Sequence, residues 1–325
     1  MNYGRHCHTI VAAITVAVAV GCAAQQPAVP TAGPTSSAVP AAPATVVQFD
    51  PQWMGLVANQ PQGWEELNRR ITSDFQQFNL RPADELDNPF GCNGCAPWTA
   101  TLTAYAPGQF DPTVVSTGQP ISVNSDGDGF LLEDPAKHAA TLAWQYADDA
   151  WATVRGRTDK TVERDRMVEL ARALQPAQRS PIRLPLSMAN VPVNLPLAEL
   201  SVDRSEYGTR LEFAPCGRTD VSGTEDCMVK SDHMGVQIWP TDHYYGHIQE
   251  DRATALTIDG KDGLYDERVN QFAVQVNPDT LVVFELSGPY PAKPTAELED
   301  ILTGVEWAPD PGNAETWPAV SDWVN

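Results

Sequence analysis

The sequence predicts an α+β fold made of two repeated units, each an antiparallel, curved sheet followed by one covering helix. Two observations carry this prediction. In residues 121–151, apolar and polar residues alternate on both sides of Asp- and Gly-rich turns, a pattern typical of antiparallel hairpins. The same pattern returns in residues 256–281. We therefore expect an internal repeat, and this repeat determines the predicted fold.

The two copies keep a nearly constant spacing along the chain. Spacings of 130 to 134 residues relate six pairs of residues: Leu142 and Phe272, Trp144 and Val274, Tyr146 and Val276, Gly129 and Gly263, Leu170 and Ile301, and Cys95 and Cys227. Loop insertions explain a drift of a few residues. The repeat predicts a first β-rich unit at residues 46–177 and a second at residues 178–325, which ends in a tail rich in Trp and Pro.

Each predicted unit closes with an amphipathic helix. In residues 162–174 the apolar residues share one face at helical spacing, and Pro176 follows them. The second helix is expected over residues 294–304, with Thr295 as a suitable N-cap. Residues 63–78 remain open between helix and strand, because their apolar residues have helical spacing whereas the corresponding part of the second unit alternates.

The first 45 residues predict export and a membrane anchor. A short apolar run precedes Ala19-Val20-Gly21-Cys22, so residues 1–22 have the composition of a signal peptide. The last four of these residues resemble the lipobox of bacterial lipoproteins. The resemblance implies that Cys22 carries the acyl lipid, palmitate included, and becomes the mature N-terminus. Residues 23–45 are mainly Ala, Pro, Thr, Gln and Ser without charge, which predicts a disordered tether.

The β-rich units also carry a resemblance. The segments TLAWQY, AWATVRG and MVELARAL, which follow a strand and a glycine turn, resemble an exported unit of bacterial envelope proteins. That unit occurs in actinobacterial lipoproteins and at the outer ends of anti-sigma and sporulation membrane proteins, and it is related to the outer-membrane lipoprotein carrier fold. The resemblance covers about half of each repeat and consists of packing motifs. It implies the fold, an extracytoplasmic location and a ligand-carrying or interaction role, and it transfers no functional residue.

Charge and cysteine content restrict the possible partners. A formal net charge of −21 argues against binding to nucleic acid or to anionic lipid. Beyond residue 22 the cysteines are Cys92, Cys95, Cys216 and Cys227, an even number that predicts two disulfides with three possible connectivities. The repeat favours one local disulfide in each unit, joining Cys92 to Cys95 and Cys216 to Cys227. A redox-active CxxC normally opens a helix, whereas Cys92-Asn-Gly-Cys95 has loop residues on both sides.

Two segments have some features of metal sites. Asn124, Asp126 and Asp128 match the first half of an EF-hand loop, but position twelve is Pro135 and the second copy has lost the pattern. We therefore expect a hairpin turn there.

His233, His243 and His247 provide the spacing of a zinc site, which requires a helix for its His-x3-His part. Pro240 and Gly246 disfavour that helix, so an exposed hairpin is expected. The sequence predicts no metal and no cofactor.

The same survey predicts a protein that is not an enzyme. The chain lacks a Gly-x-Ser-x-Gly elbow and a glycine-rich phosphate loop, and carboxylate pairs such as Asp148-Asp149 occur in turns. The predicted function is a cell-envelope lipoprotein, lipid-anchored on the extracytoplasmic face, that binds an apolar small molecule or an envelope protein. A sensing or structural component of a signalling complex is one alternative, and a metal-dependent envelope enzyme using the three histidines is another.

Overall fold

The computed structural model describes residues 49–83, 100–124, 128–137, 139–157, 164–191, 195–203, 208–215, 233–241, 253–287, 295–310 and 313–324. All of them belong to one compact unit, Pro43–Asn325. The predicted signal peptide, the anchor Cys22 and the tether lie outside the described residues. Among the helices that are described, none has the length and apolar character needed to cross a membrane.

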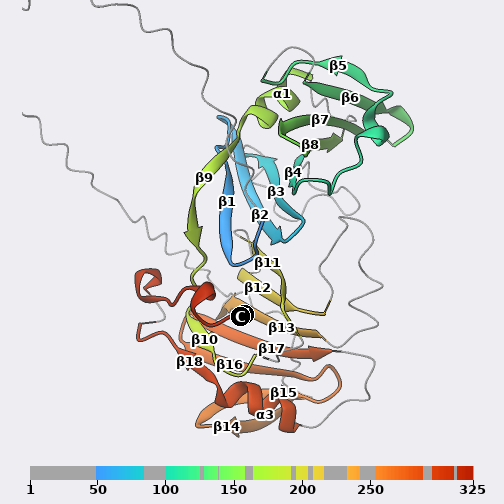
Figure 1. Cartoon of the computed structure of the whole chain (residues 1–325). Coiled ribbons are helices and arrows are strands. Elements are labelled where there is room, and N and C mark those ends of the chain that lie inside the picture. The colour runs from blue at the N-terminus through green and yellow to red at the C-terminus, as the bar shows by residue number, and fades with distance from the viewer. Residues whose placement is uncertain are drawn as a thin grey trace, which may run out of the picture. The chain divides into compact units, whose positions relative to one another are not determined.

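Strands dominate this part of the chain (Figure 1). The strands of the large sheet that come first in the chain are β2 (Trp64–Thr72), β3 (Phe75–Pro82), β4 (Ala100–Tyr105), β5 (Gln119–Ile121), β6 (Gly129–Asp134), β7 (Ala139–Ala147) and β8 (Ala150–Arg157). The later ones are β11 (Leu197–Asp203), β12 (Gly208–Phe213), β13 (His233–Pro240), β14 (Thr254–Ile258), β15 (Lys261–Asp266), β16 (Gln271–Asn277) and β17 (Thr280–Ser287). Together they form one sheet of 14 antiparallel strands.

Smaller elements complete the fold. Two further sheets pair β1 (Trp53–Ala58) with β9 (Leu174–Pro181) and β10 (Leu186–Met188) with β18 (Val305–Trp307). The described α-helices are α1 (Arg164–Arg172) and α3 (Thr295–Thr303). Single 3-10 turns occur at η2 (Pro112–Val115), η3 (Pro135–Lys137), η5 (Ala314–Thr316) and η6 (Val320–Asp322).

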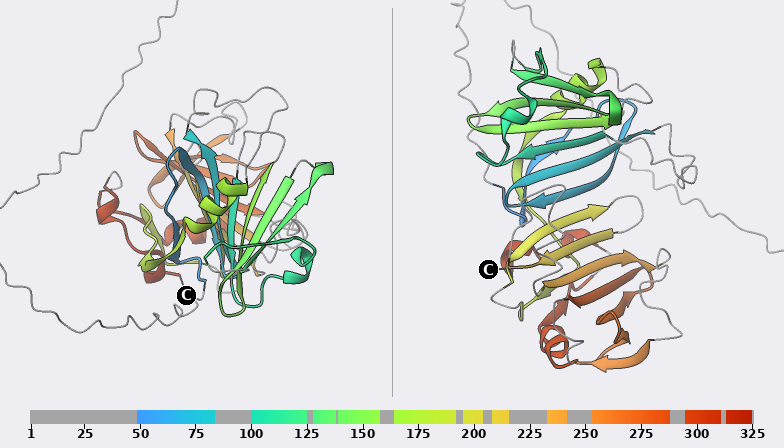
Figure 2. Two further views of the ribbon diagram at one scale, coloured as in Figure 1. Left: turned by 90° about the horizontal axis from the view of Figure 1, so that it is seen from above. Right: turned by 90° about the vertical axis from the view of Figure 1, so that its right-hand side faces the viewer.

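The large sheet has the same strand order on both sides of its centre. Outward from the β2–β11 pair, one half runs β2-β3-β4-β8-β7-β6-β5 and the other runs β11-β12-β13-β17-β16-β15-β14. Each strand of the first half therefore has a counterpart in the second, and Figure 2 shows these strands following one another across the sheet. Leu142 lies in β7 and Phe272 in its counterpart β16, as their spacing in the sequence requires.

Local irregularities repeat with the strands. The β7–β8 hairpin has a register shift between Gln145 and Ala147, and the β16–β17 hairpin has one between Gln275 and Asn277. The residue numbers of these two bulges differ by 130. A bulge changes the direction in which the following side chains point. A bulge at the same place in both hairpins therefore indicates the same backbone course in both halves.

The α+β prediction, with one helix covering each unit, is wrong. The described residues are mostly β, and their dominant feature is the 14-stranded antiparallel sheet. The two predicted helices are present but each has only nine residues. The small β1–β9 and β10–β18 sheets cover the large sheet together with these helices. The residues left open between helix and strand form strands β2 and β3.

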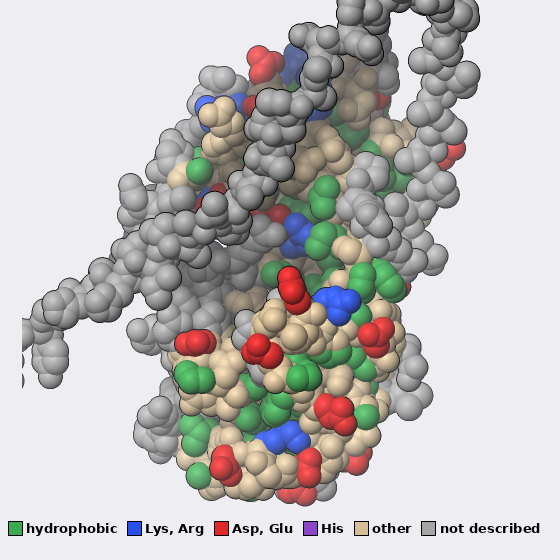
Figure 3. All heavy atoms as spheres, turned by 90° about the vertical axis from the view of Figure 1, so that its left-hand side faces the viewer, with side chains coloured by type: hydrophobic (Ala, Val, Ile, Leu, Met, Phe, Trp, Pro, Cys, Tyr) green, Lys and Arg blue, Asp and Glu red, His purple; other side chains and the backbone are tan. Residues whose placement is uncertain are grey.

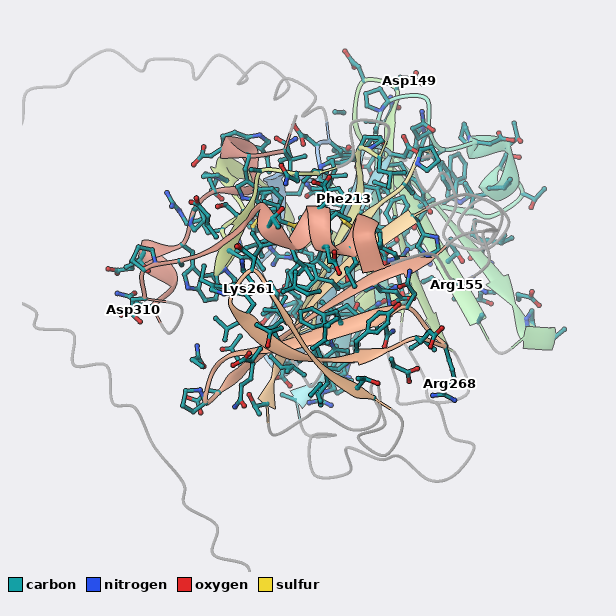
Figure 4. The ribbon with its side chains drawn as sticks, turned by 90° about the horizontal axis from the view of Figure 1, so that it is seen from below. Asp149, Arg155, Phe213, Lys261, Arg268 and Asp310 are labelled. Carbon is teal, nitrogen blue, oxygen red and sulfur yellow. The ribbon has the colours of Figure 1, made fainter. Side chains whose placement is uncertain are left out.

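The two larger apolar cores lie on one face of the large sheet, and a smaller cluster of Trp239, Ala273, Leu281 and Val283 lies on the other. In the first half, Leu142 and Trp144 pack with Leu170 of α1 and with strand β1. In the second half, Phe213 and Phe272 pack with α3, β10 and the C-terminal segment around Val320. Figure 4 shows Phe213 among these packed side chains. The apolar face of the sheet is therefore filled by the chain's own elements.

Candidate functional site

The opposite face of the sheet carries a row of mostly buried polar side chains. Partner residues in an antiparallel pair share a face, so the register traces rows of side chains from strand to strand. One such row crosses the second half of the sheet, and we call it the acidic row. From β11 to β15 its members are Glu199, Glu212, Gly235, Glu285, Gln271 and Asp266.

Most of the carboxylates in the acidic row are buried and paired with arginine. Arg70 of β2 donates two hydrogen bonds of 2.9 Å to the oxygens of Glu199. Arg268 donates to both oxygens of Asp266, at 3.3 and 2.9 Å. Arg268 itself extends outward from the packed side chains (Figure 4). Buried carboxylates are rare unless they are paired, so these contacts explain why the row is tolerated.

Glu285 is held by amide groups. Its Oε2 accepts hydrogen bonds from Gln237 Nε2 and Gln271 Nε2, both at 3.3 Å. Gln237 is oriented in turn by Trp239, whose Nε1 donates to Gln237 Oε1 at 3.1 Å. The chain of donors fixes the direction in which Glu285 presents its carboxylate.

Gly235 leaves a gap in the acidic row between Glu212 and Glu285. A Cβ atom at Gly235 would lie 3.7 Å from both carboxylate oxygens of Glu212 and 3.7 Å from the Cβ of Glu285. The missing side chain is thus bordered by one carboxylate on one side and by a glutamate stem on the other. We call this space the Gly235 gap.

Glu212 has one oxygen without a hydrogen-bond partner. Its Oε1 accepts from Arg210 Nε, whereas its Oε2 has no partner although the residue is only 3% exposed. Gln271 Oε1, in the same row, is also without a partner in a residue that is 7% exposed. Burial raises the pKa of the Glu212 carboxyl; Arg210 and His233 oppose this rise and Glu285 adds to it.

The corresponding row of the first half carries no carboxylate. Asn68, Asn79, Thr101 and Arg155 are successive partners on β2, β3, β4 and β8. Thr101 Oγ1 donates to Asn79 Oδ1 at 2.8 Å. Where the second half has a carboxylate, a glycine and a carboxylate, the first half therefore has an amide, a hydroxyl and a guanidinium.

The first half also carries aromatic side chains on this face. Tyr105, Phe110, Trp151 and Phe130 form an aromatic strip with successive ring-centroid distances of 5.1, 5.7 and 6.4 Å. The residues are half-buried. By register, Tyr105, Trp151 and Phe130 lie on the same face of the sheet as the polar row.

A separate open hollow lies beside α1. It has a volume of about 570 Å³ and is lined by Gln62, Gly63, Trp64, Pro82, Ala83, Arg166 and Glu169. Its lining mixes a hairpin end with Arg166 and Glu169, two exposed residues of α1.

Acidic side chains also occur widely elsewhere on the protein. On the face shown in Figure 3 they are spread singly over the surface rather than gathered in one patch. The net charge alone therefore does not mark a site, and burial is what distinguishes the acidic row.

Several predicted site residues lie outside the described residues: Cys22, Cys92, Cys95, Cys216, Cys227, Asp126, His243 and His247. The disulfide pairing accordingly stays a prediction. His233 begins β13 and pairs with Ser287 of β17. Within the described ranges, no group of three His, Cys, Asp or Glu residues is arranged to hold a metal ion.

Asp128 acts in the turn where the EF-hand-like segment lies. Its Oδ1 accepts from the backbone N–H of Val123 at 2.7 Å and its Oδ2 from that of Asn124 at 2.9 Å. Both carboxylate oxygens therefore bind the backbone of the hairpin, which is the role expected of a turn aspartate.

Sequence reasoning missed the acidic row, although a signal was present. Glu212 stands between Leu211 and Phe213, and Glu285 between Phe284 and Leu286. A single glutamate between two buried apolar residues of a strand must point to the other face of the sheet. The pattern identifies that face, but the meeting of Glu212 with Glu285 depends on strand pairing.

Comparison with known proteins gives no match to a family model, to a curated protein or to a solved structure. The chemistry of the chain's own residues is therefore the basis for assigning a function.

Proposed function

We propose that this chain is a lipid-anchored envelope protein on the extracytoplasmic face that binds a protein partner and is not an enzyme. The lipobox-like end of the signal segment supports the anchor at Cys22, and residues 23–45 support a tether between anchor and β-rich part. The resemblance to exported envelope units supports the same location.

The observation that carries the binding role is the contrast between the two faces of the large sheet. One face is filled by the chain's own helices and small sheets, and both larger apolar cores lie there. This arrangement favours a protein partner over the apolar small molecule that the sequence also allowed. The other face presents the half-buried aromatic strip and the exposed arginines Arg210 and Arg268, which pair with the buried acidic row. Protein interfaces combine such aromatic contacts with charged pairs.

The anchor is tested by membrane fractionation of a Cys22→Ser variant. Loss of the acyl lipid removes the buried methylenes that hold the protein in the bilayer, each worth about 0.8 kcal/mol. We expect the variant in the soluble fraction after a high-salt wash. Cys7→Ser, which changes a cysteine inside the signal segment, is the matched control and should stay with membranes. Retention of Cys22→Ser in membranes would contradict the anchor.

The binding role is tested by site-specific photo-crosslinking in the cells that produce the protein. A photoreactive residue replaces Arg210 or Arg155, which are exposed on the polar face of the sheet, or Glu306, which is exposed on β18. We expect one discrete protein adduct from the first two positions and none from Glu306. Equal adducts from all three positions, or none from any, would contradict a partner on this face.

A further inference from the structure

The Gly235 gap presents hydrogen-bond acceptors without matching donors. Glu212 Oε2 borders the gap and has no partner, although Glu212 is more than nine-tenths buried. An unsatisfied acceptor in a buried carboxylate destabilises the fold, so a donor that reaches it would be bound favourably. Gln271 Oε1, two strands from Gly235 along the same row, is a second buried acceptor in this condition.

The charges around the gap determine which donor fits. Glu212 and Glu285 stand on either side of Gly235, and among the described residues the four carboxylates of the row outnumber the three arginines that pair with them, Arg70, Arg210 and Arg268. An anion would be repelled by this row. A cation with N–H groups satisfies the acceptors and the charge together, as charge-assisted hydrogen bonds do.

The dimensions of the gap suit one planar or compact group. Neighbouring strands are about 4.8 Å apart, so the β12 and β17 backbones on either side of β13 are about 10 Å apart. Glycine at the middle strand places no side chain between them, and both carboxylate oxygens of Glu212 lie 3.7 Å from where its Cβ would be. Arg210, whose side chain is 44% exposed, already donates to the outer oxygen of Glu212, so the row is reached from solvent at this point.

From these features we infer that the Gly235 gap binds the cationic head of an arginine or lysine side chain from the partner protein. This inference rests on the proposed function, because the partner protein is the source of the cation. Glu212 Oε2 accepts from the incoming group, and Glu285 on the other side of the gap balances its charge. Thr101 stands at the corresponding position of the first half, where Asn79 is neutral and Arg155 is cationic, so that half lacks this site.

The test uses the full chain, purified in a mild detergent, and small probes. N-acetyl-arginine amide carries the guanidinium without a charged backbone, N-acetyl-lysine amide carries an ammonium, and N-acetyl-citrulline amide is the neutral isostere of the arginine probe. Binding is measured by chemical-shift titration at low salt. We expect the arginine or lysine probe to bind at least tenfold more tightly than citrulline.

Two variants place the binding at the gap. Glu212→Gln removes the charge while keeping the shape, and Gly235→Ala fills the gap with a methyl group at ordinary contact distances of 3.7 Å. Each should weaken binding of the cationic probe at least tenfold. Glu306→Gln makes the same change in net charge outside the row, and Thr101→Ser changes the corresponding position of the first half. Both controls should change the affinity less than twofold.

Thermal unfolding of each variant without probe separates loss of the site from loss of the fold. Equal binding of citrulline and arginine would overturn the inference, as would normal binding by a folded Gly235→Ala variant.

The inference about the gap and the proposed function can fail independently of each other. A crosslinked partner without probe binding would refute only the gap, whereas probe binding without any crosslinked partner would refute only the protein source of the cation.

Discussion

The two halves of the large sheet agree on one face and differ on the other. On the apolar face both halves place large buried side chains, such as Trp144 and Phe272, on corresponding strands. On the polar face the first half has Thr101 between Asn79 and Arg155 where the second half has Gly235 between two glutamates. The apolar face fixes the register, because a slip of one residue would expose every core side chain. The polar face is not needed for that purpose, so the chemical difference between the halves appears there.

The largest expected effect tests whether the two cores are equivalent. Trp144→Ala and Phe272→Ala each remove a large side chain that is at most 1% exposed, and each should lower the free energy of unfolding by about 3–5 kcal/mol. Gln145→Ala, an exposed neighbour of Trp144, should cost well under 1 kcal/mol. Denaturant unfolding measures all three. If either aromatic substitution lowered the free energy of unfolding no more than Gln145→Ala does, the two cores would not be equivalent.

The second effect concerns the ion pair where the halves meet. Arg70→Ala leaves Glu199 buried without its bidentate partner, and the cost should be about 2–3 kcal/mol, because Arg70 is itself partly exposed. Arg81→Ala breaks the more exposed pair with Glu65 and should cost about 0–1 kcal/mol. A double-mutant cycle with Glu199→Gln measures the coupling between Arg70 and Glu199. A coupling no larger than that of the Arg81 pair would mean that the junction does not depend on this contact.

Three glycine-to-alanine substitutions test the packing around individual glycines in the two halves. A Cβ at Gly263 would meet Ala273 O at 2.5 Å and the Phe272 ring at 2.6 Å, and one at Gly129 would meet Ala143 O at 2.9 Å. Overpacking of this kind costs about 1–3 kcal/mol, with Gly263→Ala at the upper end. Gly235→Ala should be neutral or stabilising by up to about 1 kcal/mol. Thermal unfolding ranks the three variants, and a different order would contradict the described packing.

The smallest effect is a pH dependence carried by Glu212. Because burial raises its pKa in the folded state, the folded protein holds this proton to higher pH than the unfolded chain does. Glu212 therefore leaves stability unaffected below the ordinary glutamate pKa and lowers it progressively as the pH rises to the folded-state pKa. Glu212→Gln removes this loss, so the variant should gain at most about 1 kcal/mol over the wild type above that range. Unfolding measured from pH 4 to pH 8 checks the sign, and a gain confined to low pH would contradict it.

The sequence alone was sufficient for features that depend on local pattern. Alternation around turns located the β7–β8 and β16–β17 hairpins, and the spacing of 130 residues matched their bulges. The helix near Leu170 was also located, because apolar residues at helical spacing mark a buried face.

Features that depend on pairing between distant segments were not predictable. Residues 63–78 had apolar spacing compatible with a helix, and only their pairing with β11 and β4 made them strands of the large sheet. The same limit hid the candidate site. Glu212 and Glu285 are far apart in sequence, and they flank Gly235 only because β13 lies between β12 and β17.

The β2–β11 junction at the centre of the sheet resembles an interface between two copies of one protein. Ile71 of β2 faces Leu200 of β11, and both strands hold the same place in their halves. Two copies of one protein that meet through a two-fold axis make a contact of this self-complementary kind. The β2–β11 junction thus has the geometry of a two-fold dimer interface, with both copies in one chain. Joining the copies covalently makes the pairing independent of protein concentration, and it allows one copy to acquire charges that an identical partner would have had to carry as well.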